Sequence, residues 1–79
     1  MLDYKLIEAL AMVAREGGFD KAARALHITQ SAVSQRVKLL EETTGQVLIA
    51  RTTPPLATSA GQKLLKHYIQ VKQLEDDLL

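Results

Sequence analysis

Residues 28–41 read Ile-Thr-Gln-Ser-Ala-Val-Ser-Gln-Arg-Val-Lys-Leu-Leu-Glu, with short hydrogen-bonding side chains where an ordinary surface helix carries Glu and Lys. At about 100° per residue, the apolar Val33, Val37 and Leu40 fall on one side of a helix. The other side carries the polar side chains Ser31, Ser34, Gln35 and Lys38. One face is therefore expected to pack, and the other to contact a partner or water.

The ends of this helix are marked by residues with known preferences. Thr29 has a side chain favoured at the N-cap, and Gly45 is typical of the position after a helix, which predicts a helix over about 30–44. A recognition helix places its N-terminal residues against base edges, and Ser and Gln supply suitable donors and acceptors. A solvated polar face without a partner gives the same pattern, so the neighbouring segments must decide.

The preceding segment has the layout of a helix-turn-helix. Residues 19–26 predict a short helix capped by Asp20, followed by a tight turn at His27-Ile28-Thr29. Ala22 and Ala23 are small enough for a close helix crossing. His27 could be a metal ligand or a general base, but the chain has no Cys and one other His, so we assign it to the turn, with a positive φ.

The flanking segments complete a winged domain. A supporting helix is expected from a cap at Asp3 to a stop at 17–18, with Leu6, Leu10 and Val13 on one face. Two short strands, 47–51 and 56–58, surround Thr52-Thr53-Pro54-Pro55 and predict a wing. Arg51 in this wing could contact a phosphate or pair internally with Glu41 or Glu42, and both alternatives stay open.

The last segment predicts a helix over 59–79, capped by Thr58 and about five turns long. Its apolar stripe is wider than one small domain can cover. It could fold back on its own domain, but a two-fold dimer explains both its length and its stripe. The expected dimer interface consists of Leu64, Tyr68, Val71, Leu74 and Leu78.

Composition narrows the class of protein. A chain of 79 residues forms one small domain of marginal stability, and its net charge of +1 provides no broad basic field for nucleic acid. The chain has no Cys, no apolar run long enough for a membrane span and no signal peptide, so we expect a cytoplasmic protein. No nucleophile motif with an orienting partner is present, so we expect no enzyme, cofactor or metal site.

The order of helix-turn-helix, wing and long terminal helix resembles the N-terminal DNA-binding domain of the LysR-type transcriptional regulators over essentially the whole chain. The matching segments are residues 17–19, 22–23, 26–34, 39–41, 45, 51 and 58–61. Within the family, residues 34–38, 51–55 and 61–65 look most similar to regulators of arginine and lysine export and metabolism. Two departures are Gln35, where Arg is common, and Ile49, where Phe is usual.

The resemblance implies roles for individual residues. Base contacts are expected from Gln30, Ser31, Ser34 and Gln35, and backbone contacts from Thr29, Arg36, Lys38, Arg51, Thr52 and Thr53. The last helix would pair antiparallel with that of a second copy. The family also carries a C-terminal effector-binding domain, for which a chain ending at Leu79 has no room, so we expect a small-molecule effector and higher oligomers only in a longer protein.

The expected fold is therefore mainly α, a winged helix-turn-helix over 1–58 followed by a linker and dimerisation helix over 59–79. The expected function is dimeric, sequence-specific binding of double-stranded DNA at a dyad-symmetric operator, through the recognition helix and a wing at about 48–58. The alternative is a winged-helix module that binds another protein and has no role on DNA.

Overall fold

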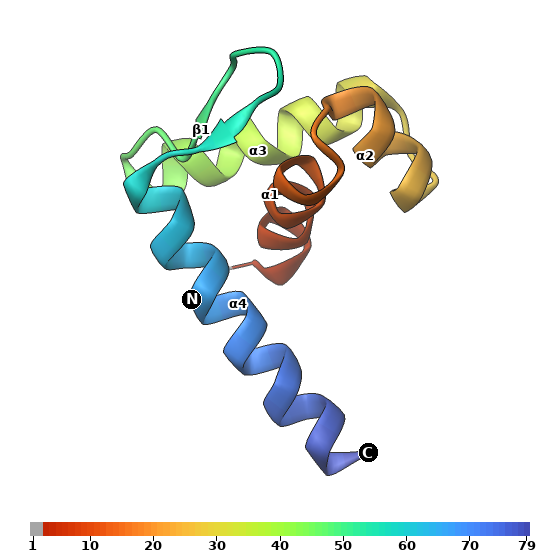
Figure 1. The fold of residues 1–79 in the computed structure, drawn as a ribbon, viewed down its shortest axis with the longest axis vertical. Helices are drawn as coiled ribbons and strands as arrows, with labels where there is room; N and C mark the ends of the chain where they lie inside the picture. Colours follow the sequence, from red (N-terminus) through yellow and green to blue (C-terminus); the bar gives the residue numbers. More distant parts are fainter. Residues whose placement is uncertain (1–2) are drawn as a thin grey trace.

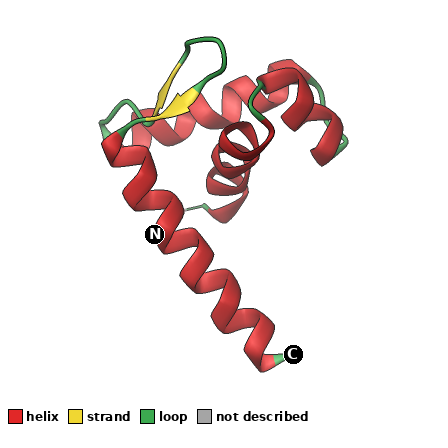
Figure 2. Cartoon of the chain, in the orientation of Figure 1, coloured by secondary structure: helices red, strands yellow, loops and turns green. Residues whose placement is uncertain are grey.

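The computed structural model describes residues 3–79. They form, in chain order, α1 (Tyr4–Glu16), α2 (Phe19–Leu26), α3 (Gln30–Thr44), β1 (Ile49–Ala50), β2 (Leu56–Ala57) and α4 (Ser59–Leu78). The first three helices gather into a head, the hairpin lies beside α3, and α4 leaves the head as a straight arm (Figure 1). Helix dominates, with the two strands as a small addition (Figure 2). The predicted winged helix-turn-helix with a long terminal helix is confirmed.

The expected caps set the ends of most helices. Before α1, the Asp3 carboxylate accepts a hydrogen bond from the Lys5 amide at 2.9 Å, and Gly17 ends the helix with a φ of 75°. Thr29 accepts from the Ala32 amide at 3.1 Å, and Gly45 ends α3 with a φ of 70°. These contacts satisfy backbone groups that a helix end leaves without partners.

The predicted cap of α2 is wrong by two residues. Gly18, in extended backbone conformation, is the N-cap, and it offers no side-chain cap hydrogen bond. Asp20 lies inside the first turn, where its negative charge suits the helix dipole. Its carboxylate pairs with Arg24 at 3.3 Å, one turn later on the exposed surface. Asp20 therefore supports the helix from within rather than starting it.

One apolar core joins the head to the hairpin. Its buried side chains come from α1, α2, α3 and the start of the wing, namely Leu6, Ile7, Ala9, Leu10, Val13, Ala22, Ala23, Val33, Val37, Leu40, Leu48 and Ile49. Ile49, the departure from the family pattern, is fully enclosed. The core thus fixes the recognition helix and the wing to the same rigid body.

The wing is an antiparallel hairpin in which Ile49 pairs with Ala57 and Ala50 with Leu56. Each strand has two residues, fewer than the predicted runs. At the tip, Pro55 would be opposite Arg51 and has no N–H for the ladder. At the other end, Thr58 already serves as the N-cap of α4. Below the ladder, Thr58 donates its amide to Leu48 and its hydroxyl to Val47, then caps α4 by accepting from the Gly61 amide at 3.1 Å. Thr58 therefore joins the wing to α4.

The five residues of the expected dimer stripe separate into two groups. Leu64 and Tyr68 are half-buried and pack against the core of their own domain, so the fold-back alternative is correct for the proximal half of α4. Leu74 and Leu78 are 65% and 86% exposed on the arm. Val71, between them, is half-buried.

Within residues 3–79, no helix is both long and apolar enough to cross a lipid bilayer.

Candidate nucleic-acid interface

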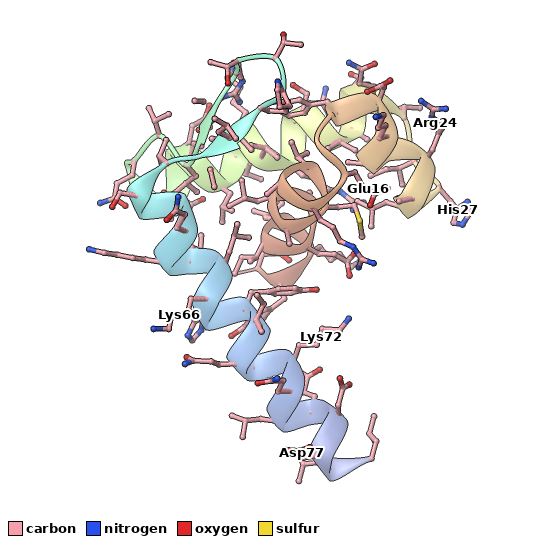
Figure 3. The ribbon with its side chains drawn as sticks, in the orientation of Figure 1. Glu16, Arg24, His27, Lys66, Lys72 and Asp77 are labelled. Carbon is pink, nitrogen blue, oxygen red and sulfur yellow. The ribbon has the colours of Figure 1, made fainter. Side chains whose placement is uncertain are left out.

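The turn before α3 sets the angle at which this helix leaves the head. His27 has a φ of 58°, the left-handed conformation expected for it, and Figure 3 shows it at an outer corner of the head. The Ile28 amide donates to the Ala23 carbonyl at 3.1 Å, which closes the end of α2. Ala22 and Ala23 are buried at the crossing, where a larger side chain would separate the helices. The predicted helix-turn-helix is confirmed.

The exposed face of α3 contains the expected base-contacting residues. Val33, Val37 and Leu40 are fully buried. On the outer face, a shallow depression is lined by Gln30, Ser31, Ser34, Gln35 and Lys38, all of them exposed. Four uncharged hydrogen-bonding side chains and one cation thus share the outer face of a single helix, and a helix is the element that a major groove admits.

A second depression connects this face to the wing. It is lined by Phe19, Gln30, Ser34, Arg51, Thr52 and Pro55. Gln30 and Ser34 belong to both depressions, so the outer face of α3 and the wing form one continuous surface. The place of Phe19 and Pro55 on this surface was not predicted from the sequence. The available signal was position, since Phe19 begins the helix before the recognition helix and Pro55 lies at the tip of the wing.

Arg51 pairs internally with Glu41, and the alternative of Glu42 is wrong. Its Nη2 lies 3.0 Å from Glu41 Oε1, and its Nη1 lies 3.5 Å from Oε2. The guanidinium also lies 5.7 Å from the centre of the Phe19 ring, within cation–π range. The Arg51 side chain is still 46% exposed. An Arg has five N–H donors, so this pairing orients Arg51 without using all of them.

Glu41 also holds the wing through its backbone. Its Oε2 accepts from the Leu48 amide at 2.9 Å and from the Ile49 amide at 3.5 Å. Burial raises the pKa of Glu41, but the hydrogen bonds from Arg51, Leu48 and Ile49 and the charge of Arg51 outweigh it, so the pKa is lowered overall. The carboxylate therefore joins α3 to the first strand of the wing.

Replacing Glu41 with Gln is expected to lower the free energy of unfolding at neutral pH by about 2 kcal/mol, because hydrogen bonds to a charged group are lost. Because folding lowers the pKa of Glu41, its carboxylate stabilises the folded protein at pH values above the pKa of the unfolded chain. This contribution is lost as the pH falls through the pKa of the folded state. The difference between wild type and variant should therefore shrink below about pH 4. Urea unfolding from pH 3 to 7 measures it, with the exposed neighbour Glu42→Gln as control. A pH-independent difference would contradict the assignment.

The expected backbone-contacting residues do not all reach this surface. Lys38, Arg51 and Thr52 lie on it. Thr29 and Thr53 are exposed at its margins, the first at the start of α3 and the second at the wing tip. Arg36 is half-buried and lines neither depression. Because two helical residues span about 200°, it faces nearly away from Lys38, so the fold does not bring it to this surface.

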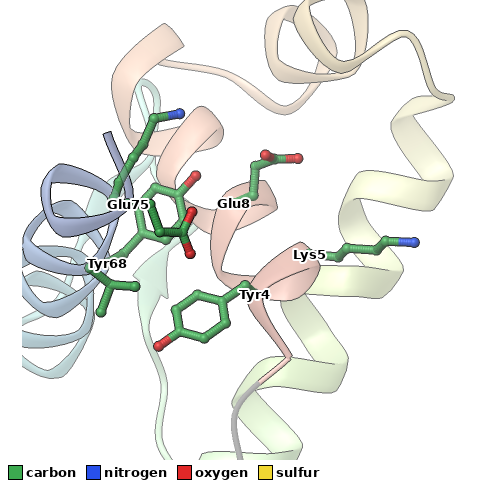
Figure 4. Close-up of a pocket in the computed structure, with 7 residues that line it drawn as sticks. Tyr4, Lys5, Glu8, Tyr68 and Glu75 are labelled. Carbon is green, nitrogen blue, oxygen red and sulfur yellow. The ribbon is translucent and has the colours of Figure 1, made fainter. Parts of the chain in front are cut away.

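The contact of α4 with α1 fixes the arm to the head. The Tyr4 hydroxyl shares a hydrogen bond of 3.3 Å with His67 Nε2, and the Tyr4 ring lies 6.5 Å from that of Tyr68. A cleft between α1 and α4 is lined by Tyr4 and Glu8 on one side and by Tyr68 and Glu75 on the other (Figure 4). None of Tyr4, His67 and Tyr68 lines either of the two depressions on α3 and the wing.

Comparisons with known proteins agree with this geometry. The model of the family described as "bacterial regulatory helix-turn-helix protein, lysR family" matches residues 4–62. An HTH-type transcriptional regulator ArgP of Pseudomonas aeruginosa is 55% identical over 99% of this chain, which spans 26% of that protein. The chain thus covers about a quarter of the length of such relatives.

Solved structures give the same result. The crystal structure of ArgP from Mycobacterium tuberculosis superposes with a TM-score of 0.94 at 49% identity, over 99% of this chain and 30% of that one. A complex of the BenM DBD with catB site 1 DNA has a TM-score of 0.90 at 27% identity, over 98% of this chain and 84% of that one. The head and the arm of the present fold both recur in these proteins.

Proposed function

Because this chain belongs to the LysR family of bacterial regulatory helix-turn-helix proteins, we propose that it is a sequence-specific DNA-binding module that regulates transcription. The observation that supports this most is the continuous exposed surface formed by the outer face of α3 and the wing. In a solved structure of the same fold, the BenM DBD is in complex with DNA. No catalytic arrangement is needed for this activity, and we propose none.

The roles on DNA follow from position on this surface. Gln30, Ser31, Ser34 and Gln35 read base edges in the major groove, since they occupy the first turns of α3. Lys38, Arg51 and Thr52 contact phosphates on either side, with Thr29 and Thr53 at the margins. The free amides at the start of α3 add a further preference for phosphate.

The larger protein is also part of the proposal. Residues 1–58 form the DNA-binding unit, and 59–79 form the helix through which two copies pair, with Leu74 and Leu78 exposed for that contact. Relatives extend far beyond this length, which leaves room for a further domain that binds an effector and builds higher oligomers. Relatives named ArgP support an amino-acid-related role, and we propose that the regulated genes serve the export or metabolism of basic amino acids. A regulator of bacterial genes acts in the cytoplasm, beside the chromosome.

Selection from a randomised pool of DNA duplexes tests the proposal. We expect a dyad-symmetric site to be enriched, because two identical copies read two half-sites. If Lys38 and Arg51 each neutralise one phosphate per half-site, the logarithm of affinity should fall with that of salt concentration with a slope of about −4. No enrichment and no salt dependence would instead support a module that binds another protein.

A further inference from the structure

The depression between α3 and the wing has an apolar part. It is lined by side chains from α2, α3 and the wing, namely Phe19, Gln30, Ser34, Arg51, Thr52 and Pro55. The four polar side chains have proposed roles on DNA, two of them toward base edges and two toward phosphates. Phe19 and Pro55 carry no polar side-chain group, and both are half-buried. These two residues form an apolar floor, which neither base edges nor phosphates explain.

The fold holds the apolar floor in place. Phe19 packs against the core from the start of α2, and the Arg51 guanidinium lies 5.7 Å from the centre of its ring. At the tip of the wing, the Thr52 hydroxyl donates to the Pro54 carbonyl at 2.8 Å. A Cβ at Gly17 would lie 4.0 Å from the Pro54 Cβ, so the tip rests against the turn that precedes α2. The floor is therefore preformed.

The position of the floor beside α3 indicates which part of DNA it faces. A major groove is about 12 Å wide, and a helix with its side chains is about 10–12 Å across, so α3 would fill the groove. A surface beside α3 then faces the wall of the groove. That wall is a sugar–phosphate strand, which separates the major groove from the neighbouring minor groove. The floor lies on the wing side of α3, so it faces this strand and not the base edges.

The side chains of the depression also match the chemistry of that strand. A DNA backbone alternates a charged phosphate with an uncharged deoxyribose, whose carbon-bound hydrogens present an apolar surface. Arg51 supplies a cation and Thr52 a hydroxyl, and both suit phosphate. Phe19 and Pro55 instead offer carbon surface, which gains free energy when a sugar covers it and removes it from water. The depression thus has one set of side chains for each part of the repeating unit.

We propose that Phe19 and Pro55 bind one deoxyribose of the sugar–phosphate strand in each half-site, beside the phosphate contacted by Arg51 and Thr52. The inference rests on the proposed DNA-binding function and adds two contact residues to it. A sugar contact is independent of sequence, because every nucleotide carries the same sugar. It is also independent of salt, because covering an uncharged group releases no counterion. Together these properties distinguish it from a base contact and from a phosphate contact.

Two substitutions test the apolar floor. Pro55→Ser makes the floor polar at the tip of the wing, and Phe19→Leu removes the ring but keeps an apolar side chain for the core. Each variant should bind the selected dyad site and a random duplex about tenfold more weakly than wild type, since apolar contact is lost in both half-sites. Its salt slope should equal that of wild type. Fluorescence anisotropy with both duplexes across a range of salt measures these quantities, and urea unfolding checks that each variant is folded.

Leu56→Ser is the matched control, because Leu56 follows Pro55 in the wing, is 61% exposed and lines neither depression. It should bind both duplexes nearly as wild type does. A loss confined to the selected site would assign the floor to a base, and a shallower salt slope would assign it to a phosphate. Either result would overturn the inference, as would unchanged binding by Pro55→Ser or an equal loss in Leu56→Ser. A wild-type chain that bound neither duplex would overturn the proposed function itself, and the inference with it.

Discussion

Replacing Gly61 with Ala is expected to lower the free energy of unfolding by about 3 kcal/mol, although alanine is the better helix former by about 1 kcal/mol. Gly61 is buried in the first turn of α4, where the helix crosses the start of the wing. A Cβ at this position would overlap the carbonyl oxygen of Leu48 and come within 3.0 Å of its carbonyl carbon. Backbone atoms cannot move aside as a side chain can, so the helix or the wing must shift.

The consequence of this shift extends beyond stability. The Leu48 carbonyl accepts the Thr58 amide, and the Leu48 amide donates to Glu41, so displacing Leu48 strains the cap of α4 and the attachment of the wing together. For a domain of this size, 3 kcal/mol corresponds to a fall in the melting temperature of about 12–24 °C. Calorimetry and urea unfolding of the purified variant measure both quantities.

Gly45→Ala provides the control for this experiment. Gly45 has a φ of 70° and open space around its Cβ position, so the variant pays the cost of a left-handed conformation alone, about 1–2 kcal/mol. Gly61, in contrast, has helical backbone and no space. If Gly61→Ala were as stable as wild type, the close crossing of α4 over Leu48 would be wrong. If both variants lost the same amount, the crossing would carry no cost of its own.

The local signals in the sequence predicted much of this fold. Thr29, Gly45 and Thr58 act through their own backbone neighbourhood, so their capping roles could be assigned from type and position. Asp20 was misassigned because Asp is favoured both at a cap and within the first turn, and the sequence does not distinguish these two positions. Gly61 was noted only as part of a family motif. Its need for a glycine comes from close contact with the backbone of Leu48, thirteen positions earlier, which a local pattern does not reveal.

The part of the site that lies on one helix could be predicted from the sequence. The prediction was incomplete for the part where two elements meet. The outer face of α3 follows from helical periodicity, which is sufficient to place Gln30 and Ser34 on the same side of the helix. The choice of Glu41 over Glu42 by Arg51 depends on the path of the wing across α3, which periodicity does not describe. The place of Phe19 on this surface was not predicted for the same reason, because α2 and the wing approach each other only in the folded chain.

The Gln30→Ala variant is expected to bind the selected dyad site about a hundredfold or more weakly, while its binding to random DNA stays within about threefold of wild type. Gln30 is the first residue of α3, is exposed, and lines both depressions, so it lies at the centre of the surface. A well-made base contact contributes about 1–3 kcal/mol of discrimination, and a dimer on a dyad makes each contact twice. Alanine preserves the helix, so the loss reports the contact.

Lys38→Ala is the matched comparison, because Lys38 lies on the same exposed face but carries a charge suited to phosphate. Its loss should weaken binding to the selected site and to random duplex by the same factor, and the salt slope should become shallower by about 2, one for each half-site. Fluorescence anisotropy with both duplexes across a range of salt separates the two behaviours. Parallel losses from both variants on both duplexes would show that Gln30 holds the backbone instead of reading a base, and the reading surface would then have to be sought nearer Ser31 and Gln35.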